Sequence, residues 1–212
     1  MRYTAFGKVA ILITLLVSPL PLGGSQAADT LKDRARAHGG KTSSSVHADL
    51  PFASLTDVVS RANVVVRARI QEKESRLTND GNFVRTYYTF SPTRTFKDTV
   101  GINPKRRTPQ MTIPLVFFES GGLVKVEGLQ IHQTSNTAVD PPLNVGDDVV
   151  LLLDWDKDAN AFRLQNGPYG LLRVHGETVA EATKATKRGL AGKSVSDIEA
   201  EIERLVKGVP VG

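Results

Sequence analysis

Apolar and polar residues alternate along two neighbouring stretches of the chain, with the period of two that a half-buried β-strand requires. In residues 63–71 one face is apolar, and the other face carries Arg67 and Arg69. The alternation resumes in residues 82–96, and Asn-Asp-Gly at 79–81 is a strong turn signal between the two stretches. We therefore expect two long strands, the first of which buries Val64, Val66, Ala68 and Ile70.

Shorter apolar runs predict five further strands, at residues 111–118, 123–127, 149–155, 161–165 and 171–175. Pro114 indicates that the first of these lies at a sheet edge. We expect the second to pair back on the first, and the third and fourth to form a hairpin. Residues 129–143 have no periodicity and are expected to form a long loop.

Helical periodicity occurs only at the two ends of this region. Ser54, followed three residues later by Asp57, predicts a capping box and a short helix that ends near Ala62. A second capping box is expected at Ser196, at the start of a helix over residues 196–207 with the apolar stripe Ile198, Ile202, Leu205 and Val206. Several strands with helices only at the ends predict a mainly β fold: an OB-like small β-barrel with a short N-terminal helix and a C-terminal helix.

Residues 1–27 have the features of a secretory signal peptide. Arg2 and Lys8 precede an apolar run at 9–17, and Ser25-Gln26-Ala27 supplies the small residues of a cleavage site. The run is shorter than the roughly 20 residues of a spanning helix, although an uncleaved anchor is the alternative. We expect a secreted or periplasmic protein in four parts: signal peptide 1–27, flexible leader 28–50, barrel domain 51–180 and C-terminal segment 181–212.

Composition narrows the class of protein. The 212 residues include 27 Lys and Arg, 22 Asp and Glu, and no Cys. The absence of Cys excludes a disulfide scaffold, a zinc finger of the usual type and thiol catalysis. Without Arg2 and Lys8 the mature chain would carry 25 basic and 22 acidic residues, a net charge too small to indicate a nucleic-acid binder.

Three segments resemble the netrin-like domain of tissue inhibitors of metalloproteinases. Residues 62–69 resemble its first strand, Tyr88 and residues 96–98 resemble its second strand and the Phe-Lys-Gly that follows, and residues 146–152 resemble a later strand start. The chain is also similar to uncharacterised secreted bacterial proteins with the same order of signals. The resemblance covers residues 55–175 and implies an OB-type barrel. It does not imply inhibition, because the family uses an N-terminal Cys that this chain lacks.

An acidic segment is the candidate calcium site. Asp154, Asp156, Asp158 and Asn160 place oxygen atoms at alternate positions, as a calcium loop does. Ala159 stands where that loop requires Gly, and Gln165 stands where it requires a bidentate Glu. The alternative is a solvated turn, since Asp and Asn favour turns. The sequence leaves calcium binding at Asp154, Asp156 and Asp158 open.

Residues 118–122, Phe-Glu-Ser-Gly-Gly, are similar to the Gly-Asp-Ser-Gly-Gly motif of chymotrypsin-like proteases. His47 and Asp57 precede Ser120 in the order of that triad, but His47 is too close in sequence for a two-barrel protease. A glycine turn between strands is the expectation. The four histidines, His38, His47, His132 and His175, do not have the sequence spacing of metal ligands. Of these, only His132 and His175 are candidates to lie close together in the folded protein.

One predicted strand face is a candidate binding surface. Phe83, Arg85 and Tyr87 share a face, and Arg67 and Arg69 lie on the neighbouring strand. Aromatic rings interleaved with Arg can stack on nucleic-acid bases, but export makes a polyanionic glycan or cell-wall polymer the better candidate. An ordinary outer strand face is the alternative.

No convergent set of nucleophile, base and oxyanion donors is recognisable. The sequence therefore predicts an exported, non-catalytic binding or interaction module, with no catalytic, cofactor or metal residue assigned. The expected partner is a protein or a cell-surface polymer, with no nucleic acid, no cofactor and no membrane span after signal removal. The alternative is a secreted hydrolase with an active site on its loops.

Overall fold

The computed structural model describes residues 30–102, 114–183 and 186–208. The predicted signal peptide, residues 1–27, lies outside the described residues. In chain order the elements are α1 (Leu31–Ala37), β1 (Lys41–Val46), α2 (Leu55–Arg61), β2 (Val64–Leu77), β3 (Val84–Asp98), β4 (Val116–Ser120), β5 (Gly122–Val126), β6 (Leu129–Ser135), β7 (Asp148–Asp156), β8 (Ala161–Leu164), the 3-10 helix η2 (Gly167–Gly170), β9 (Leu171–His175), β10 (Thr178–Glu181) and α3 (Val195–Val206).

Five strands close a ring, which is the OB-like barrel expected from the sequence. β2 pairs antiparallel with β3 and with β7, and β3 pairs antiparallel with β4. β4 pairs parallel with β8, and β8 returns antiparallel to β7, which completes the ring. β9 and β10 extend the sheet beyond β7. The predicted hairpin of residues 149–155 and 161–165 corresponds to β7 and β8.

The inside of the ring holds the main core. Val64, Val66, Ala68 and Ile70 of β2 are at most 1% exposed, as their alternation predicts. They pack with apolar residues of the other ring strands, including the rings of Phe90, Phe117 and Phe162. Complete burial of such side chains is the largest favourable contribution to folding that a domain of this size has.

A second apolar layer covers the outside of β2, β7 and β9. Val65 of β2 is as buried as Val64, because α2 and α3 pack against this face together with Val150, Leu152 and Leu172. The alternation in residues 63–71 predicts only one buried face. Two helices therefore change the surroundings of the opposite face, where the sequence places Arg67.

The helices α2 and α3 are both capped by serine. Ser54 caps α2 in a complete capping box with Asp57, as predicted. α3 begins one residue before the expected start, and its N-cap is Ser194 rather than Ser196. Ser194 lies three residues before Asp197 and accepts a hydrogen bond from the Asp197 amide at 3.0 Å. Within the described parts of the chain, no helix has the length and apolar character needed to cross a membrane.

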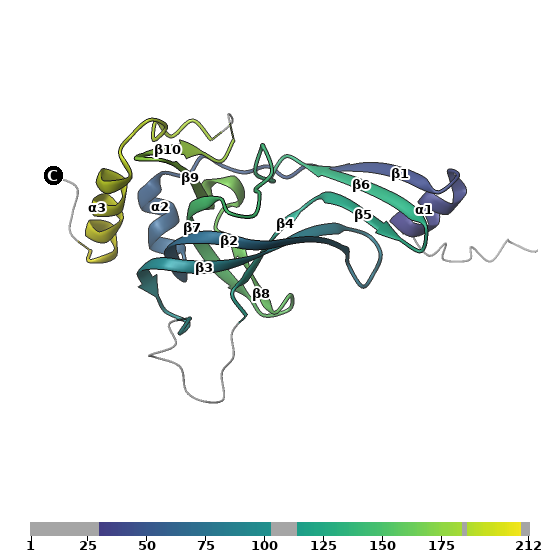
Figure 1. Ribbon diagram of the computed structural model, residues 1–212, viewed down its shortest axis with the longest axis horizontal. Helices are drawn as coiled ribbons and strands as arrows, with labels where there is room; N and C mark the ends of the chain where they lie inside the picture. Colours follow the sequence, from purple (N-terminus) through teal and green to yellow (C-terminus); the bar gives the residue numbers. More distant parts are fainter. Residues whose placement is uncertain (1–29, 103–113, 184–185, 209–212) are drawn as a thin grey trace, which may run out of the picture.

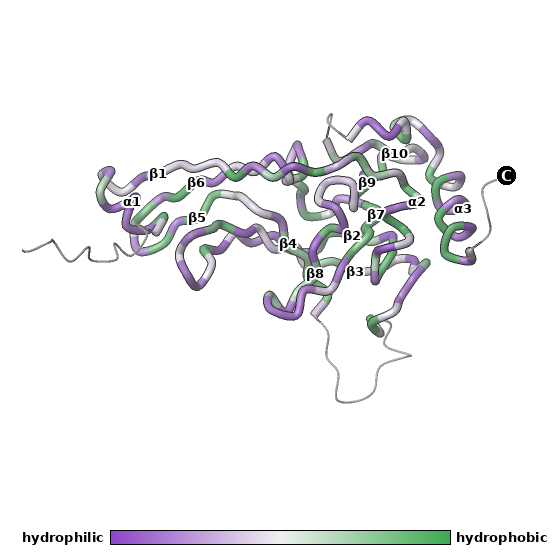
Figure 2. The backbone as a smooth tube through the Cα atoms, turned by 180° about the vertical axis from the view of Figure 1, so that it is seen from behind, coloured by the Kyte–Doolittle hydropathy of each residue, from purple (hydrophilic) through white to green (hydrophobic). Residues whose placement is uncertain are grey.

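A second sheet and a helix extend from the barrel as an arm, which consists of α1, β1, β5 and β6 (Figure 1). β6 pairs parallel with β1 and antiparallel with β5. Leu31 and Ala35 of α1 are fully buried in a small core with Val84 and Ile131. Figure 2 shows that hydrophobic backbone segments concentrate in the barrel, whereas β1 is neutral to hydrophilic.

The arm corrects three expectations. Residues 28–50 are not a flexible leader throughout, because α1 buries an apolar side and β1 has a partner strand. Residues 129–143 are not entirely a loop, because Leu129–Ser135 forms β6. Residues 122–126 pair with β6 and not with the preceding β4. In each case the partner is non-local, so the local sequence pattern does not reveal it.

Candidate functional site

A cavity of about 830 Å³ opens where the barrel meets the arm. Lys73 of β2, Tyr88 of β3 and Glu119 of β4 form the barrel side, and residues 132–136 of β6 and its following loop form the arm side. The following loop adds Ala138, Val139, Asp140 and Pro142 to the wall. Pockets of roughly 300–1,000 Å³ are the size of small-molecule sites.

Gly121 and Gly122 create this junction, because the chain leaves β4 for β5 there. Their φ angles are +104° and +135°, a region that L side chains rarely adopt. A Cβ at Gly122 would collide with Thr86 Oγ1 and lie 2.7 Å from Ser75 Oγ, and one at Gly121 would lie 2.9 Å from the carbonyl oxygen of Gln133. The expected glycine turn is confirmed, and it joins two sheets.

Hydrogen bonds fix the turn against β3. Thr86 Oγ1 donates to the carbonyl oxygen of Gly121 at 2.7 Å, and the Ser75 and Thr86 hydroxyls are 2.9 Å apart. The Gly121 amide donates to the carbonyl oxygen of Val84 at 2.7 Å. The Gln133 side chain accepts from the Val84 amide at 2.8 Å and so connects β6 to β3. These bonds hold the cavity walls in one arrangement.

Glu119 is a buried acidic residue of the cavity, with 7% of the residue exposed. Its Oε2 accepts a hydrogen bond from the Val139 amide at 3.3 Å. Its Oε1 is buried and has no hydrogen-bond partner among the described residues. Burial raises the pKa of Glu119 to about 7, although the Val139 amide and the charges of Arg173 and Lys73 oppose that rise.

The two basic side chains whose charges lower the pKa of Glu119, Lys73 and Arg173, are bonded to other acceptors. Lys73 Nζ donates to the carbonyl oxygen of Leu143 at 3.0 Å. Arg173 Nη1 donates to Asp147 Oδ2 at 3.3 Å, and its Nη2 donates to the carbonyl oxygen of Pro141. Among the described residues, no ion pair joins Glu119 to either of them. Within the part of the chain that the structure describes, the carboxyl group therefore lacks a direct counter-ion.

Tyr88 forms an aromatic wall beside Glu119. Its ring stacks on Phe117, with centroids 5.0 Å apart and an interplanar angle of 20°. Lys73 Nζ lies 5.7 Å from the centroid of the Tyr88 ring. Burial, and then the charge of Glu119, raises the pKa of Tyr88 above its ordinary value, so the phenol is neutral at physiological pH.

The residues of the protease-like motif are dispersed. Ser120 and His132 both line the cavity, but no hydrogen bond joins them in the described structure. His47 is exposed after β1, and Asp57 caps α2 by accepting from the Ser54 amide at 3.0 Å. Ser120, His47 and Asp57 therefore form no triad. His132 lies in the arm, whereas His175 ends β9 of the barrel sheet.

The acidic segment at 154–160 forms the turn between β7 and β8. Asp156 Oδ1 accepts from the amides of Asp158 and Ala159 at 3.1 and 3.0 Å, and Asp154 lies 3.8 Å from Arg163. Within residues 30–102, 114–183 and 186–208 no group of three or more His, Asp or Glu side chains has an arrangement that could hold a metal ion. Asp156 acts here as a turn cap, the arrangement in which Asp is common.

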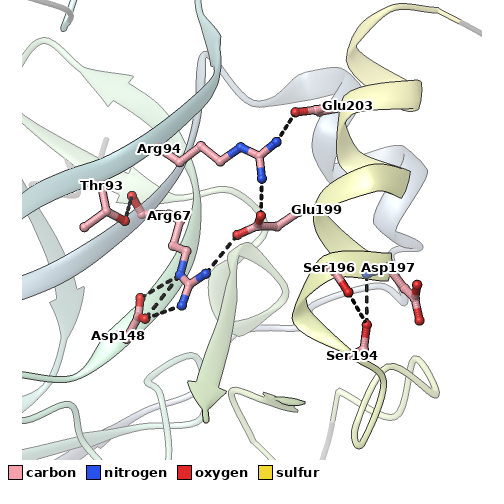
Figure 3. Close-up of polar contacts among 9 residues, drawn as sticks. All are labelled: Arg67, Thr93, Arg94, Asp148, Ser194, Ser196, Asp197, Glu199 and Glu203. Atoms are coloured by element: carbon pink, nitrogen blue, oxygen red, sulfur yellow. Dashed lines mark hydrogen bonds and ion pairs between the residues drawn. The ribbon is translucent and has the colours of Figure 1, made fainter. Parts of the chain in front are cut away.

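The arginine and aromatic residues predicted to share one binding surface lie in two separate parts of the structure. The position of Arg67 on its strand predicts a side chain exposed to solvent, but the structure shows it only partly exposed. It donates to Asp148 Oδ2 at 2.6 Å and to Glu199 Oε1 at 3.2 Å (Figure 3). Arg85 and Tyr87 instead contact Phe118, with the Arg85 guanidinium 4.4 Å from the centre of its ring. Arg67 therefore belongs to the attachment of α3 and not to an exposed polymer-binding face.

Sequence reasoning did not identify Glu119, yet a signal for it exists. In Val116–Ser120 the period of two places Glu119 on the same face as Phe117, which is fully buried. A carboxyl group on the apolar face of a strand is the kind of exception that indicates a site. A scan against protein-family models and a search of curated proteins find no match to the chain, so its function must be inferred from the cavity itself.

Proposed function

We propose that the protein is an exported binding module that holds a small ligand in the cavity between barrel and arm without catalysing a reaction. The observation that carries this proposal is the buried Oε1 of Glu119, which has no partner among the described residues. Buried polar atoms in folded proteins nearly always have a hydrogen-bond partner, and one without a partner requires an explanation. A ligand that donates a hydrogen bond would supply that partner.

The construction of the cavity supports ligand binding. Its walls combine hydroxyl groups, such as those of Ser75 and Thr86, with the apolar surfaces of Tyr88 and Val139. Binding sites for small molecules have this composition, in which apolar walls provide affinity and a few fixed polar groups provide orientation. The bonded turn at Gly121 makes the site preformed, which lowers the entropic cost of binding.

A hydrolase is the second candidate, and one observation favours it. A carboxyl group with a pKa of about 7 is suited to general acid–base catalysis at neutral pH. Ser120 lies next to it and lines the same cavity. Among the described residues, however, the Ser120 hydroxyl has no hydrogen bond to a base, which a serine nucleophile requires.

Binding in the cavity is tested by filling it. Ala138 lines the cavity, whereas Ala159 lies in the β7–β8 turn. We expect NMR screening of a fragment library to find compounds that shift the Val139 amide resonance in the wild type. Ala159→Phe should bind the same compounds, and Ala138→Phe should bind none of them. The proposal is wrong if no fragment shifts cavity resonances, or if Ala138→Phe binds as well as Ala159→Phe does.

A further inference from the structure

The unsatisfied position in the cavity is a single acceptor atom. Glu119 Oε2 already accepts from the Val139 amide, and Oε1 has no partner in the described structure. An ionised carboxylate can only accept hydrogen bonds. A group that fits this position beside the ionised form must therefore donate at least one, and a charged donor forms a hydrogen bond about twice as strong as a neutral one.

Among the residues that the structure describes, the charged side chains around Glu119 form no ion pair with it. From β2, Lys73 is bonded to Leu143, and from β9, Arg173 is bonded to Asp147 and Pro141. Tyr88 on β3 is neutral, β6 contributes His132 to the cavity wall, and the loop contributes a further acid, Asp140. An anionic ligand would meet two carboxylates here against one lysine, Lys73, whose ammonium group is already bonded to the carbonyl oxygen of Leu143. A cationic ligand would meet a carboxylate that has no ion pair with any described residue.

We infer that the ligand is a small organic amine whose ammonium group pairs with Glu119 Oε1, an inference that rests on the proposed binding function. An ammonium group has three donors, so one can bond Glu119 while the others remain for hydroxyl or carbonyl groups. The body of the amine would lie against Tyr88, Val139 and Pro142 in the same cavity. A volume of about 830 Å³ limits the ligand to a small molecule.

Pairing with an amine couples binding to a proton. Burial holds the pKa of unliganded Glu119 at about 7, so below that pH the carboxyl group must lose its proton before it accepts the ammonium. An alkylammonium ion keeps its own charge throughout the neutral range, as the Lys side chain does. The affinity for an amine should therefore fall roughly tenfold from pH 8 to pH 6. The affinity for a neutral alcohol should not fall in this way.

The test compares hexylammonium, hexan-1-ol and hexanoate by calorimetry and by NMR shifts of the Val139 amide. Glu119→Gln keeps the shape of the side chain and removes its charge. The control, Glu177→Gln, makes the same change at an exposed residue before β10. In the wild type and in Glu177→Gln we expect hexylammonium to bind most tightly, with roughly tenfold weaker binding at pH 6. Glu119→Gln should lose both the preference for ammonium and the pH dependence.

Failure of the inference differs from failure of the proposed function. If hexan-1-ol or hexanoate binds in the cavity at least as tightly as hexylammonium, the ligand class is wrong and cavity binding stands. If no probe shifts cavity resonances, the amine inference is overturned, and the Ala138→Phe comparison decides the proposed function separately. If Glu119→Gln does not fold, the pH dependence of hexylammonium affinity in the wild type still tests the inference. An affinity that does not change with pH would overturn the pairing with Glu119.

Discussion

Arg67 of β2 donates a 3.2 Å hydrogen bond to Glu199 of α3, a residue 132 positions later in the chain. The Glu199 side chain is 8% exposed, and its second oxygen accepts from Arg94. Arg94 in turn pairs with Glu203, one turn further along the helix (Figure 3). One buried carboxylate therefore joins two arginines of the barrel to the C-terminal helix.

Glu199→Ala should destabilise the protein by about 2 kcal/mol, because it leaves two arginines without a buried partner. Arg67 keeps Asp148, and Arg94 keeps Glu203, so the cost should be below that of an isolated buried pair. Denaturant unfolding measures the loss. The control is Glu201→Ala on the same helix, which should cost well under 1 kcal/mol. Equal costs at the two positions would contradict the role of the network.

Ile70→Ala should cost roughly 2–5 kcal/mol, the range for emptying a well-packed core site. Ile70 is 1% exposed and points into the barrel. Its neighbour Arg69 is exposed on the other face, so Arg69→Ala should cost well under 1 kcal/mol. Similar losses in thermal unfolding for the two variants would show that the register of β2 is wrong.

Gly122→Ala should destabilise more than Gly128→Ala. Both glycines have positive φ, +135° and +77°, so both substitutions strain the backbone by about 1 kcal/mol. Only at Gly122 does the new Cβ collide with Thr86, whereas nothing lies within 4 Å at Gly128. We expect an additional loss of about 1–3 kcal/mol at Gly122 in denaturant unfolding. Equal losses would mean that the β4–β5 junction is looser than described.

The stability of the free protein should fall as pH rises from about 5 to 8. Glu119 has an ordinary pKa of 4.5 and a folded-state pKa of about 7, so between these values the folded state binds more protons than the unfolded state. The loss contributed by this group approaches about 3 kcal/mol above pH 7. Glu119→Gln should therefore match the wild type near pH 4.5 and exceed it in stability at pH 8. A constant difference across this range would contradict the burial of an ionisable Glu119.

Ser120→Ala distinguishes binding from hydrolysis. In the binding module Ser120 is a partly buried residue before a glycine turn, so its replacement should change stability by about 1 kcal/mol at most. A catalytic serine would behave differently, since its loss lowers the rate by orders of magnitude. Labelling of the wild type by a fluorophosphonate, abolished in Ser120→Ala, would favour the hydrolase over the binding module.

The barrel is predictable because its strands carry their own pattern. Val64, Val66 and Ile70 alternate with polar neighbours, and Val149 begins a nearly continuous apolar run. The arm is not predictable in this way. β1 reads Lys-Thr-Ser-Ser-Ser-Val and has almost no apolar side, and it becomes a strand by pairing with Gln130 and the residues after it. Non-local pairing of this kind leaves no local periodicity.

The candidate site is predictable only in part. The alternation of Phe117 and Glu119 places the carboxyl group inside, which is local information. Its lack of a counter-ion among the described residues depends on Lys73 being bonded to Leu143, and residues so far apart in sequence are brought together only by the complete fold. Arg67 is the converse case, because its strand position predicts exposure while α3 covers it.

The parallel pairing of β1 with β6 has a consequence for biosynthesis. A chain is made from its N-terminus, so residues 41–46 leave the ribosome long before residues 130–135, with which they pair. In that interval α1 also lacks Ile131, one of the apolar residues that bury Leu31 and Ala35. The β2–β3 hairpin, whose strands are consecutive, can form earlier. A nascent chain paused before residue 129 would therefore carry an N-terminal segment with no strand to join, open to chaperones and proteases until β6 emerges.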